Sequence, residues 1–500
     1  MEESAFAQDP VSVVAAWLHR LAFACVSAVL LLSPWTFSSW EMWWFWPMVA
    51  VLFLGCFFSG TAVLLPIFFG SPHHSHRHSS GHSLPPALCL TVLFIPFLLY
   101  AFVRAGHASA PGSPLVAMEA ERSLLLFTTP ILLGLVLFFS STSARRRFLV
   151  PALLVNTAVQ AVYGLTSFFV FGGKRVLWVE DLYFLEKGNR LLGSFYCANY
   201  FSAFMNIALC VFLAILLTSA ISKRAKILAA LAIPLLLAAN FFTLSRGGIG
   251  SLVLGLGLAI PLVAFRGRRL WVRLVAPVLM LLLLGTVFLA IRYTDNPFMQ
   301  RAERHPLWIA WMKSESVSDY LPKIHDAFWY QFDRGTYIDS ALRAWRTNPA
   351  WGIGPGQHSN RWQQFAPTDD GVRPVDGDPT TMKKPRLLND TYHLYEVHSD
   401  WTQLLEEYGV VGILLFAIPF LGGFVLLAIR QGRELRSNEP GVLRALPLAA
   451  LLSAAILTVH SLFDFSFQIP CITWSFAALV TLALIPGQTE SESNEDSGRS

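Results

Sequence analysis

Long apolar runs constrain this chain more than any other feature. A helix needs about 20 residues to cross a hydrocarbon core of about 30 Å, and runs of that length recur along most of the sequence. A backbone inside lipid has no water to bond with, so it must satisfy its own hydrogen bonds, which selects helices or closed barrels. The alternating pattern of a barrel strand is absent. The sequence therefore predicts an all-α polytopic membrane protein.

The composition agrees with this class. Hydrophobic residues make up 54% of the 500-residue chain and charged residues only 14%, whereas about 25% of the residues in an average soluble protein are charged. We expect about twelve transmembrane helices, one for each apolar run that reaches the length of a span. The expected spans are residues 12–33, 43–70, 85–103, 122–141, 148–171, 193–220, 225–244, 247–265, 270–291, 403–429, 442–463 and 469–486.

The orientation follows from Lys and Arg in the short loops, which concentrate on the cytoplasmic side of membrane proteins. Four basic clusters fall on one side of the expected topology, so we predict that both termini are cytoplasmic. The large loop at residues 292–402 is then extracytoplasmic, as are the loop at 172–192 and the turn at Ser245–Gly248. The clusters are Arg145 to Arg147; Lys223, Arg224 and Lys226; Arg266, Arg268, Arg269 and Arg273; and Arg430, Arg433, Arg436 and Arg444.

The spans and loops divide the chain into five segments. The outer loop is expected to be helical and packed, because it is rich in aromatic side chains. Such side chains need to be buried or to have a sugar stacked on them. Its tryptophans are Trp308, Trp311, Trp345, Trp351 and Trp362. The segments are N-terminal transmembrane helices at 1–141, a transmembrane core at 142–291, the outer loop at 292–402, C-terminal transmembrane helices at 403–486 and a disordered cytoplasmic tail at 487–500.

Several kinds of chemistry find little support in the sequence. The six cysteines lie in or beside apolar runs, so we expect neither a disulfide nor a thiolate metal site. The net charge of +5 does not indicate a nucleic-acid partner. The Gly352–Gly356 run does not follow a strand of a βαβ unit, so it is interpreted as a turn and not as a dinucleotide site.

Two patterns leave metal binding open, although we predict no metal at the functional site. Asp376-x-Asp378 has the form used by metal-dependent glycosyltransferases, but flanking prolines favour a solvated turn. Five histidines crowd one cytoplasmic loop, where metal binding is the less favoured interpretation. They are His73, His74, His76, His78 and His82.

Two arginines are expected at the outer face of the membrane. Arg190 precedes a span that holds Asn199 and Asn206, and Arg246 lies in the short Thr243–Gly248 turn between two spans. An arginine near membrane depth is costly unless it is paired or solvated, and two guanidinium forks on one face suit a diphosphate. An ordinary interface arginine that snorkels to water is the alternative for Arg246.

A histidine marks the point where the outer loop returns to the membrane. His398 precedes Asp400 and Gln403, which resemble a capping box at the start of a short surface helix, and Gly409 is placed to end that helix. A histidine can take a proton from a hydroxyl near neutral pH, although a lone surface histidine usually has no such role.

A further ionisable pair lies near the outer end of a later span. His460 and Asp464 are one helical turn apart and can pair. Ionisable groups within membrane spans are functional candidates by default, and a structural pair is the alternative.

Three segments, the last in two parts, together resemble the O-antigen ligase and polymerase superfamily of bacterial envelopes. Arg190 to Asn206 is similar to the family's Arg-x-x-Gly-x-Phe stretch and polar-flecked helix, and Thr243–Gly248 to its Ser-Arg-Gly turn. Asn348–Gly356 and His398–Gly409 look like its Pro-x-x-Gly-x-Gly and His-x-Asp-x-x-Gln-Leu signatures. Ser399 departs from the Asn that is common there.

The resemblance extends over about residues 150–485 and is carried by the order and sidedness of the motifs. It implies a glycosyltransferase of the bacterial inner membrane with a GT-C-like fold. By it, Arg190 and Arg246 would hold the undecaprenyl diphosphate of a lipid-linked glycan donor, and His398 would act on the acceptor hydroxyl. By the same resemblance, Asp400, Gln403 and Glu407 are also expected to belong to the substrate-binding site.

The resemblance also implies which partners the chain meets. They are the lipid bilayer, the lipid-linked glycan donor and a glycan or glycolipid acceptor, without a cofactor. Because arginines can neutralise a diphosphate in place of a metal, we expect a metal-independent reaction, and attack opposite the leaving group would invert the anomeric centre.

The leading hypothesis is a ligase that moves a glycan from undecaprenyl diphosphate to a lipid A-core or another surface acceptor. A polysaccharide polymerase and a protein O-oligosaccharyltransferase are rivals within the same class. A bicarbonate-type transporter is a rival from another class, but no clear inverted repeat supports it. A purely structural scaffold would not need Arg190, Arg246 and His398 together.

Overall fold

The computed structural model describes residues 10–69, 84–108, 110, 113, 115–172, 175–180, 190–218, 221–264, 300, 303, 306–314, 316–326, 333–365, 396–434 and 441–485. The expected span at 270–291 lies outside these residues, as do Asp376, Asp378, the cluster from His73 to His82 and the tail at 487–500.

Apolar helices dominate the described residues, and nine of them are long and apolar enough to cross a membrane. Each expected span that falls on described residues contains a helix, so the polytopic helical architecture is confirmed. The helices found in the expected spans, of which α8 and α17 are not among those nine, are α1 (Pro10–Leu32), α2 (Met42–Phe69), α3 (Pro86–Ala108), α4 (Ala117–Ser140), α5 (Ser143–Phe171), α6 (Ala198–Leu217), α7 (Lys223–Phe242), α8 (Arg246–Ala264), α15 (Asp400–Glu434), α16 (Leu446–His460) and α17 (Pro470–Leu484).

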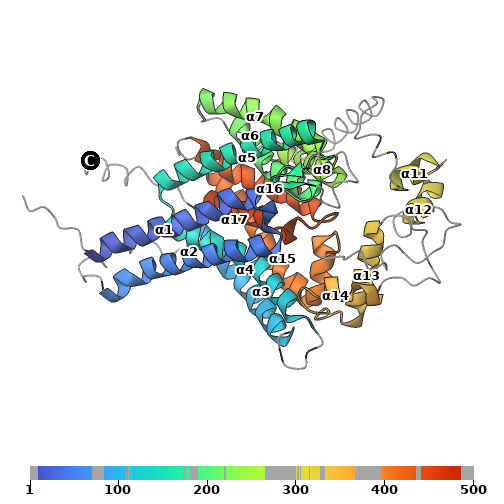
Figure 1. Cartoon of the computed structure of the whole chain (residues 1–500), viewed down its shortest axis with the longest axis horizontal. Helices are drawn as coiled ribbons and strands as arrows, with labels where there is room; N and C mark the ends of the chain where they lie inside the picture. The colour runs from blue at the N-terminus through green and yellow to red at the C-terminus, as the bar shows by residue number, and fades with distance from the viewer. Residues whose placement is uncertain are drawn as a thin grey trace, which may run out of the picture.

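The helices are arranged as one body with the outer-loop helices at one end (Figure 1). Those loop helices are α11 (Pro306–Met312), α12 (Val317–Asp326), α13 (Asp333–Thr347) and α14 (His358–Phe365), which agrees with the expected helical loop. A small antiparallel hairpin of β1 (Arg175–Val176) and β2 (Val179–Glu180) pairs Arg175 with Glu180. It is the one departure from an all-α fold among the described residues.

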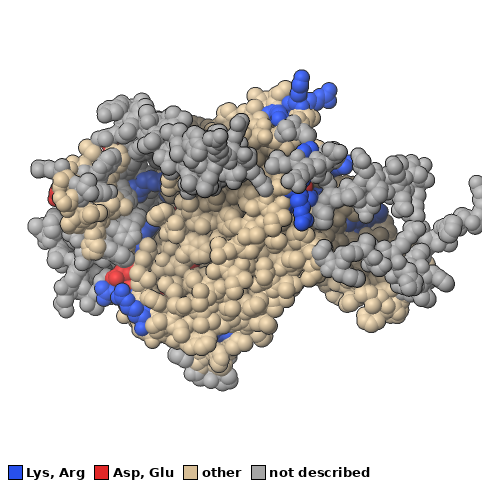
Figure 2. All heavy atoms as spheres, turned by 180° about the vertical axis from the view of Figure 1, so that it is seen from behind, with Lys and Arg blue, Asp and Glu red and all other residues tan. Residues whose placement is uncertain are grey.

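The surface has the charge distribution of a membrane protein. Figure 2 shows Lys and Arg toward the two ends of the molecule, with a broad wall free of charged side chains between them. Large apolar side chains are also exposed on the long helices, including Phe57 on α2 and Leu231 on α7, which are 65% and 68% exposed. Such exposure is favourable only where lipid tails replace water.

Helix α6 lies at the centre of the core and is buried along nearly its whole length. Its polar residues bond to neighbouring helices: Asn206 Nδ2 donates to Gly248 O at 2.9 Å, and Asn240 Nδ2 donates to Asn206 Oδ1 at 2.7 Å. A Cβ on Gly248 would collide with Ser202, so only glycine allows α8 to approach α6 this closely. These contacts fix the turn that carries Arg246.

The outer loop is docked on the beginning of α15 by backbone hydrogen bonds. Ile353 N donates to Glu406 O at 2.8 Å, and Val410 N donates to Pro349 O at 3.0 Å. Gly409 has a φ of 67° and interrupts the helix, which confirms the expected stop there. The Gly352–Gly356 run forms the expected turn against this interrupted helix.

Candidate functional site

Arg190 is hydrogen-bonded to the end of α7, next to the turn that contains Arg246. Its Nε donates to Thr243 O at 2.8 Å, and one terminal nitrogen donates to Asn199 Oδ1 at 2.8 Å. Arg246 is the first residue of α8, three positions after Thr243. Both arginines are partly exposed. The two arginines predicted to share one face therefore belong to neighbouring segments at one end of the helix bundle.

Asp464 is the centre of the polar cluster at this end. It lies between α16 and the short helix η8 (Ser466–Gln468), and it is only 1% exposed. Its Oδ2 accepts from Asn199 Nδ2 at 2.7 Å and from a terminal nitrogen of Arg334 at 3.1 Å. Its Oδ1 lies 3.4 Å from His398 Nδ1. One carboxylate thus joins α6, α13 and the end of the outer loop.

The charges around Asp464 keep it ionised. Burial acts to raise the pKa of the Asp464 carboxyl, but the Arg334 guanidinium and the contact with His398 outweigh burial and hold that pKa well below its ordinary value. Asp464 is therefore a carboxylate at every physiological pH. Such a group can orient an imidazole and stabilise its protonated form.

His460 is a weaker partner of Asp464 than the sequence spacing indicates. Its Nε2 lies 4.0 Å from Asp464 Oδ2, at the limit of an ion pair. Its Nδ1 is 2.7 Å from the hydroxyl oxygen of Ser466 instead. The helix ends at His460, so the spacing of one helical turn does not continue to Asp464.

His398 is held from three sides. Tyr337 of α13 stacks on its ring at a centroid distance of 5.5 Å, and Phe465 approaches it edge-on at 4.6 Å. The third side is Asp464. His398 has a φ of 60°, a left-handed conformation that is uncommon for a residue with a side chain. When Nδ1 carries the proton toward Asp464, the lone pair of the neutral ring is on Nε2, the nitrogen that can accept a proton.

The expected capping box is wrong in its details. Asp400 does not cap α15: its Oδ2 accepts from Phe467 N at 3.0 Å and so ties the helix start to η8. Ser399 takes the capping position, since its hydroxyl accepts from Thr402 N at 3.4 Å. The Gln403 side chain does reach back, as a capping box requires, but to Val397 N at 3.1 Å.

Asp400, Gln403 and Glu407 are buried, and their side chains bond within the protein. Gln403 Nε2 donates to Glu407 Oε1 at 3.1 Å, and Glu407 Oε2 accepts from Gly356 N at 2.8 Å. This geometry favours a role in positioning His398 and the glycine turn. Their role in substrate binding stays a prediction.

A buried ion pair that no sequence pattern predicts lies between α14 and α15. His358 of α14 is fully buried, with its Nδ1 2.8 Å from Glu406 Oε2. Burial lowers the pKa of His358, but Glu406 outweighs this and raises it overall. Burial also raises the pKa of the nearby Glu396 to about 7. His358 and Glu406 meet only because α14 packs against α15 in the folded chain. Their spacing along the sequence therefore does not predict the pair.

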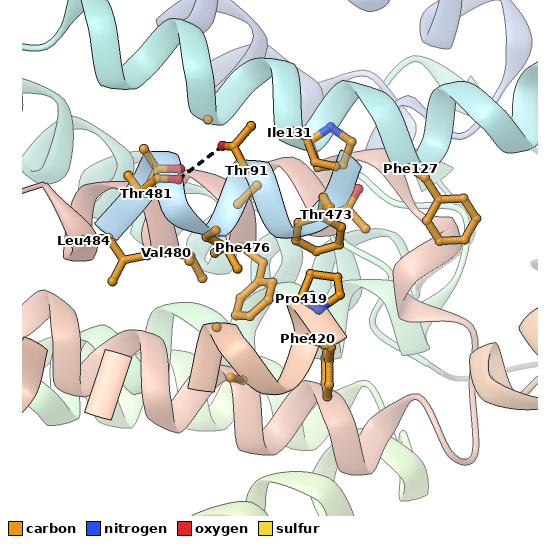
Figure 3. A pocket seen from close by; sticks show the side chains of 18 of the residues that line it. Thr91, Phe127, Ile131, Pro419, Phe420, Thr473, Phe476, Val480, Thr481 and Leu484 are labelled. Atoms are coloured by element: carbon orange, nitrogen blue, oxygen red, sulfur yellow. Dashed lines mark hydrogen bonds between the residues drawn. The ribbon is translucent and has the colours of Figure 1, made fainter. Parts of the chain in front are cut away.

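A separate apolar cavity of about 170 Å³ lies among α3, α4, α15 and α17. Figure 3 shows Phe127, Phe420 and Phe476 among the side chains around it. No ionisable side chain lines this cavity, so it offers no counter-charge for a phosphate. The polar cluster around Asp464 is therefore the candidate site. No group of metal-ligating side chains occurs within the described ranges.

Comparison with known proteins gives a match to a protein family. The family model described as O-Antigen ligase matches residues 231–417, a range that contains Arg246, Arg334 and His398. Arg190 and Asp464 lie outside the matched range. No curated protein gave a significant match. This match over residues 231–417 supports the resemblance of the chain to the O-antigen ligase superfamily.

Proposed function

We propose that this protein transfers a glycan from undecaprenyl diphosphate to an acceptor hydroxyl at the extracytoplasmic face of the bacterial inner membrane. The observation that carries the proposal is the cluster in which Asp464 contacts His398 and is linked through Asn199 to Arg190. These contacts support the proposal, because they join the proposed base His398 to the proposed diphosphate-binding residue Arg190 at one end of the helix bundle.

Arg190 and Arg246 are proposed to hold the diphosphate. Guanidinium groups bind phosphate oxygens through two parallel hydrogen bonds, and neutralising the developing charge of a leaving group is typically the largest single contribution to such catalysis. Arg190 already uses Nε and one terminal nitrogen within the protein. Those bonds hold its guanidinium plane in place, so that little order is lost when the donor binds.

His398 is proposed to activate the acceptor. As the acceptor oxygen attacks the anomeric carbon, its proton passes to His398 Nε2, and the bond from that carbon to the diphosphate oxygen breaks. Undecaprenyl diphosphate leaves with the bonding electron pair, and the anomeric centre is inverted. Asp464 orients the ring and stabilises the imidazolium that forms. No step of this sequence requires a metal ion.

A transport function is less well supported. The ionisable groups of the cluster lie where the outer loop meets the bundle, whereas transporters bind substrates near the middle of the membrane. The cavity among α3, α4, α15 and α17 is apolar and has no ionisable side chain in its lining.

The proposal is tested by deleting the gene and analysing the surface glycans of the cell. Loss of acceptor-linked polymer, with polymer still made on the lipid carrier, is the expected result. Accumulation of single repeat units on the carrier would indicate a polymerase instead. Unchanged surface glycans and carrier-linked intermediates would contradict both.

A further inference from the structure

Residues other than glycine adopt a left-handed backbone at two places within the described ranges. The first is the candidate site, where Leu244 and His398 have φ values of 50° and 60°. The second is a pair of turns on the outer side of the predicted topology, at η2 (Phe37–Ser39) and at Leu177, with φ values from 52° to 61°. Such a backbone is costly for a residue with a side chain and is typically retained where a ligand or substrate binds. The second place is therefore a candidate binding site.

The two turns meet in a cluster of four aromatic rings, which we call the aromatic platform: Phe37, Trp44, Trp178 and Tyr196. Leu177 and Trp178 form the turn between β1 and β2. The Phe37 ring stacks on Tyr196 at a centroid distance of 4.5 Å and meets Trp178 edge to face at 5.4 Å. Trp44 meets Trp178 at 6.4 Å. Phe37 is 2% exposed, whereas Trp178 is 63% exposed, so a buried base presents one indole to the outside.

The hairpin that carries Trp178 is held in place before any ligand arrives. Leu177 N donates to Tyr163 Oη of α5 at 2.6 Å, directly beside Trp178. Val176 of β1 is fully buried against the base of the platform. A ring that is already fixed loses little conformational freedom when a ligand stacks on it. The platform is therefore built to bind, although its exposed indole has a large apolar surface.

The platform adjoins the segment that carries Arg190. Leu192, two positions after Arg190, packs against Phe37 and Val176 in the same cluster. Leu191 N donates to Phe242 O at 2.9 Å, which fixes this segment to the end of α7. A glycan attached to a diphosphate at Arg190 would therefore leave the candidate site next to the platform.

An exposed tryptophan near a membrane boundary can also be an interfacial anchor. Trp43 has the features of an anchor: it is 67% exposed on α2 and shares an exposed helix face with Trp46 and Phe57. Trp178 does not belong to such a face. Helix α5 ends at Phe171, and Gly172, with a φ of 61°, turns the chain out of the helix before the hairpin begins.

A carboxylate beside the platform favours a sugar over a lipid. Glu41 directly precedes α2 and lies close enough to Tyr196 to interact with it electrostatically. A carboxylate is unfavourable against lipid tails, but it accepts hydrogen bonds from hydroxyl groups. Aromatic rings with a few polar groups at their edge are the usual lining of a small-molecule site.

We propose that the aromatic platform binds a sugar ring of the glycan donor, stacked on Trp178, at a point separate from the diphosphate. The faces of a pyranose ring carry C–H groups, which the negative face of an indole attracts. This inference rests on the proposed function, because it takes the glycan to be part of a lipid-linked donor. It makes Trp178 a residue that selects and positions the glycan and takes no part in the chemical step.

The test measures equilibrium binding of free glycan to the purified full-length protein in lipid nanodiscs. The probe is the glycan that mild acid releases from the lipid carrier of the same cells, so that it has neither diphosphate nor lipid. Fluorotryptophan labelling and fluorine NMR report which tryptophans the probe contacts. Trp178→Phe identifies the Trp178 signal by its loss.

We expect the glycan to shift the Trp178 signal, and undecaprenyl diphosphate without its sugar to leave that signal unchanged. Trp178→Ala should bind the glycan about tenfold more weakly, the usual cost of losing one aromatic stacking contact. Trp178→Leu should bind as weakly, because it keeps apolar bulk but has no aromatic face. Trp178→Phe keeps a ring and should lose less. The control is Trp43→Ala, which should bind as the wild type does.

The outcomes separate this inference from the proposed function, which a transfer assay on the same protein tests directly. If the wild type transfers glycan, but Trp178→Ala and Trp178→Leu bind the free glycan as tightly as the wild type, Trp178 is an interfacial anchor and the inference is overturned alone. A wild type that transfers glycan without any change in the Trp178 signal also overturns it. If the wild type binds the glycan through Trp178 but transfers it to no acceptor, the proposed function fails, and the platform is a glycan-binding site of a protein with another role.

Discussion

At the scale of single residues, His398 combines a left-handed backbone with contacts to Tyr337, Phe465 and Asp464. Such a conformation typically costs about 1–3 kcal/mol and persists only when its surroundings impose it. We expect His398→Ala to retain donor binding but to transfer about 10²–10⁴-fold more slowly, the usual contribution of a general base. A transfer assay alongside a donor-binding assay tests this.

Unchanged transfer would remove His398 from the mechanism. Lost donor binding would move it into the diphosphate site and leave the base to be sought at His393, outside the described residues, or at Glu407.

Arg246 tests whether charge alone is enough at the donor site. Lysine keeps the charge but cannot make the planar, two-pronged contact of a guanidinium. We expect Arg246→Lys to slow transfer by about 10²–10³-fold, the usual effect of losing a contact that strengthens in the transition state. Arg224→Lys, at the exposed start of α7, is the matched control and should behave as the wild type. Near-normal transfer by Arg246→Lys would favour the alternative of a snorkelling arginine.

We expect the buried Glu396 to make the stability of the folded protein sensitive to pH. Burial raises the pKa of Glu396 from 4.5 to about 7, so the folded protein holds a proton that the unfolded chain has released between these values. The wild type therefore loses stability as pH rises through this window. Glu396→Gln should match it near pH 5 and melt at a higher temperature at pH 8. Thermal unfolding at both pH values tests this, and a difference independent of pH would show that Glu396 does not titrate there.

At the scale of secondary-structure elements, the interruption of α15 is what holds the outer loop. Gly409 has a φ of 67°, and a Cβ there would collide with Ala350 O. We expect Gly409→Ala to lower the melting temperature by several degrees, because alanine is strained at positive φ and the loop must also move. Gly60→Ala on α2 is the control, since a Cβ there meets nothing within 4 Å. Equal melting temperatures for the two variants would mean that the loop is held elsewhere.

The sequence predicts these elements because their causes are local. Apolar runs of membrane length become helices wherever lipid surrounds them, and glycine at a helix end signals a stop. The boundaries are less well predicted: α6 begins at Ala198 and not near 193, because Gly193 turns the chain with a φ of 61°. The misassigned cap has a similar cause. Ser399, Asp400 and Gln403 all have capping side chains, and tertiary contacts decide which of them caps.

At the scale of the whole molecule, the site depends on contacts that no local pattern encodes. Asn199 reaches Asp464 across 265 positions, and Arg334 reaches it across 130. Arg190, Arg246 and His398 could be proposed from the sequence because each stands in a motif at a membrane boundary. Arg334 is one of several arginines in a polar helix, so only the packing of α13 against the bundle distinguishes it.

The orientation of the molecule in the membrane decides which substrates can reach the cluster. The basic clusters predict that the outer loop faces away from the cytoplasm. By the proposed function, an acceptor arriving there from the aqueous side would meet a donor held in the bilayer. Arg346, exposed near the end of α13, and Arg224, exposed at the start of α7, lie on opposite sides of the predicted topology. A membrane-impermeant thiol reagent applied to intact spheroplasts should label Arg346→Cys, and should label Arg224→Cys only after the membrane is broken. The wild type, whose six cysteines are buried or half-buried, gives the background. The reverse pattern would place the cluster on the cytoplasmic side, where the proposed transfer to a surface acceptor could not take place.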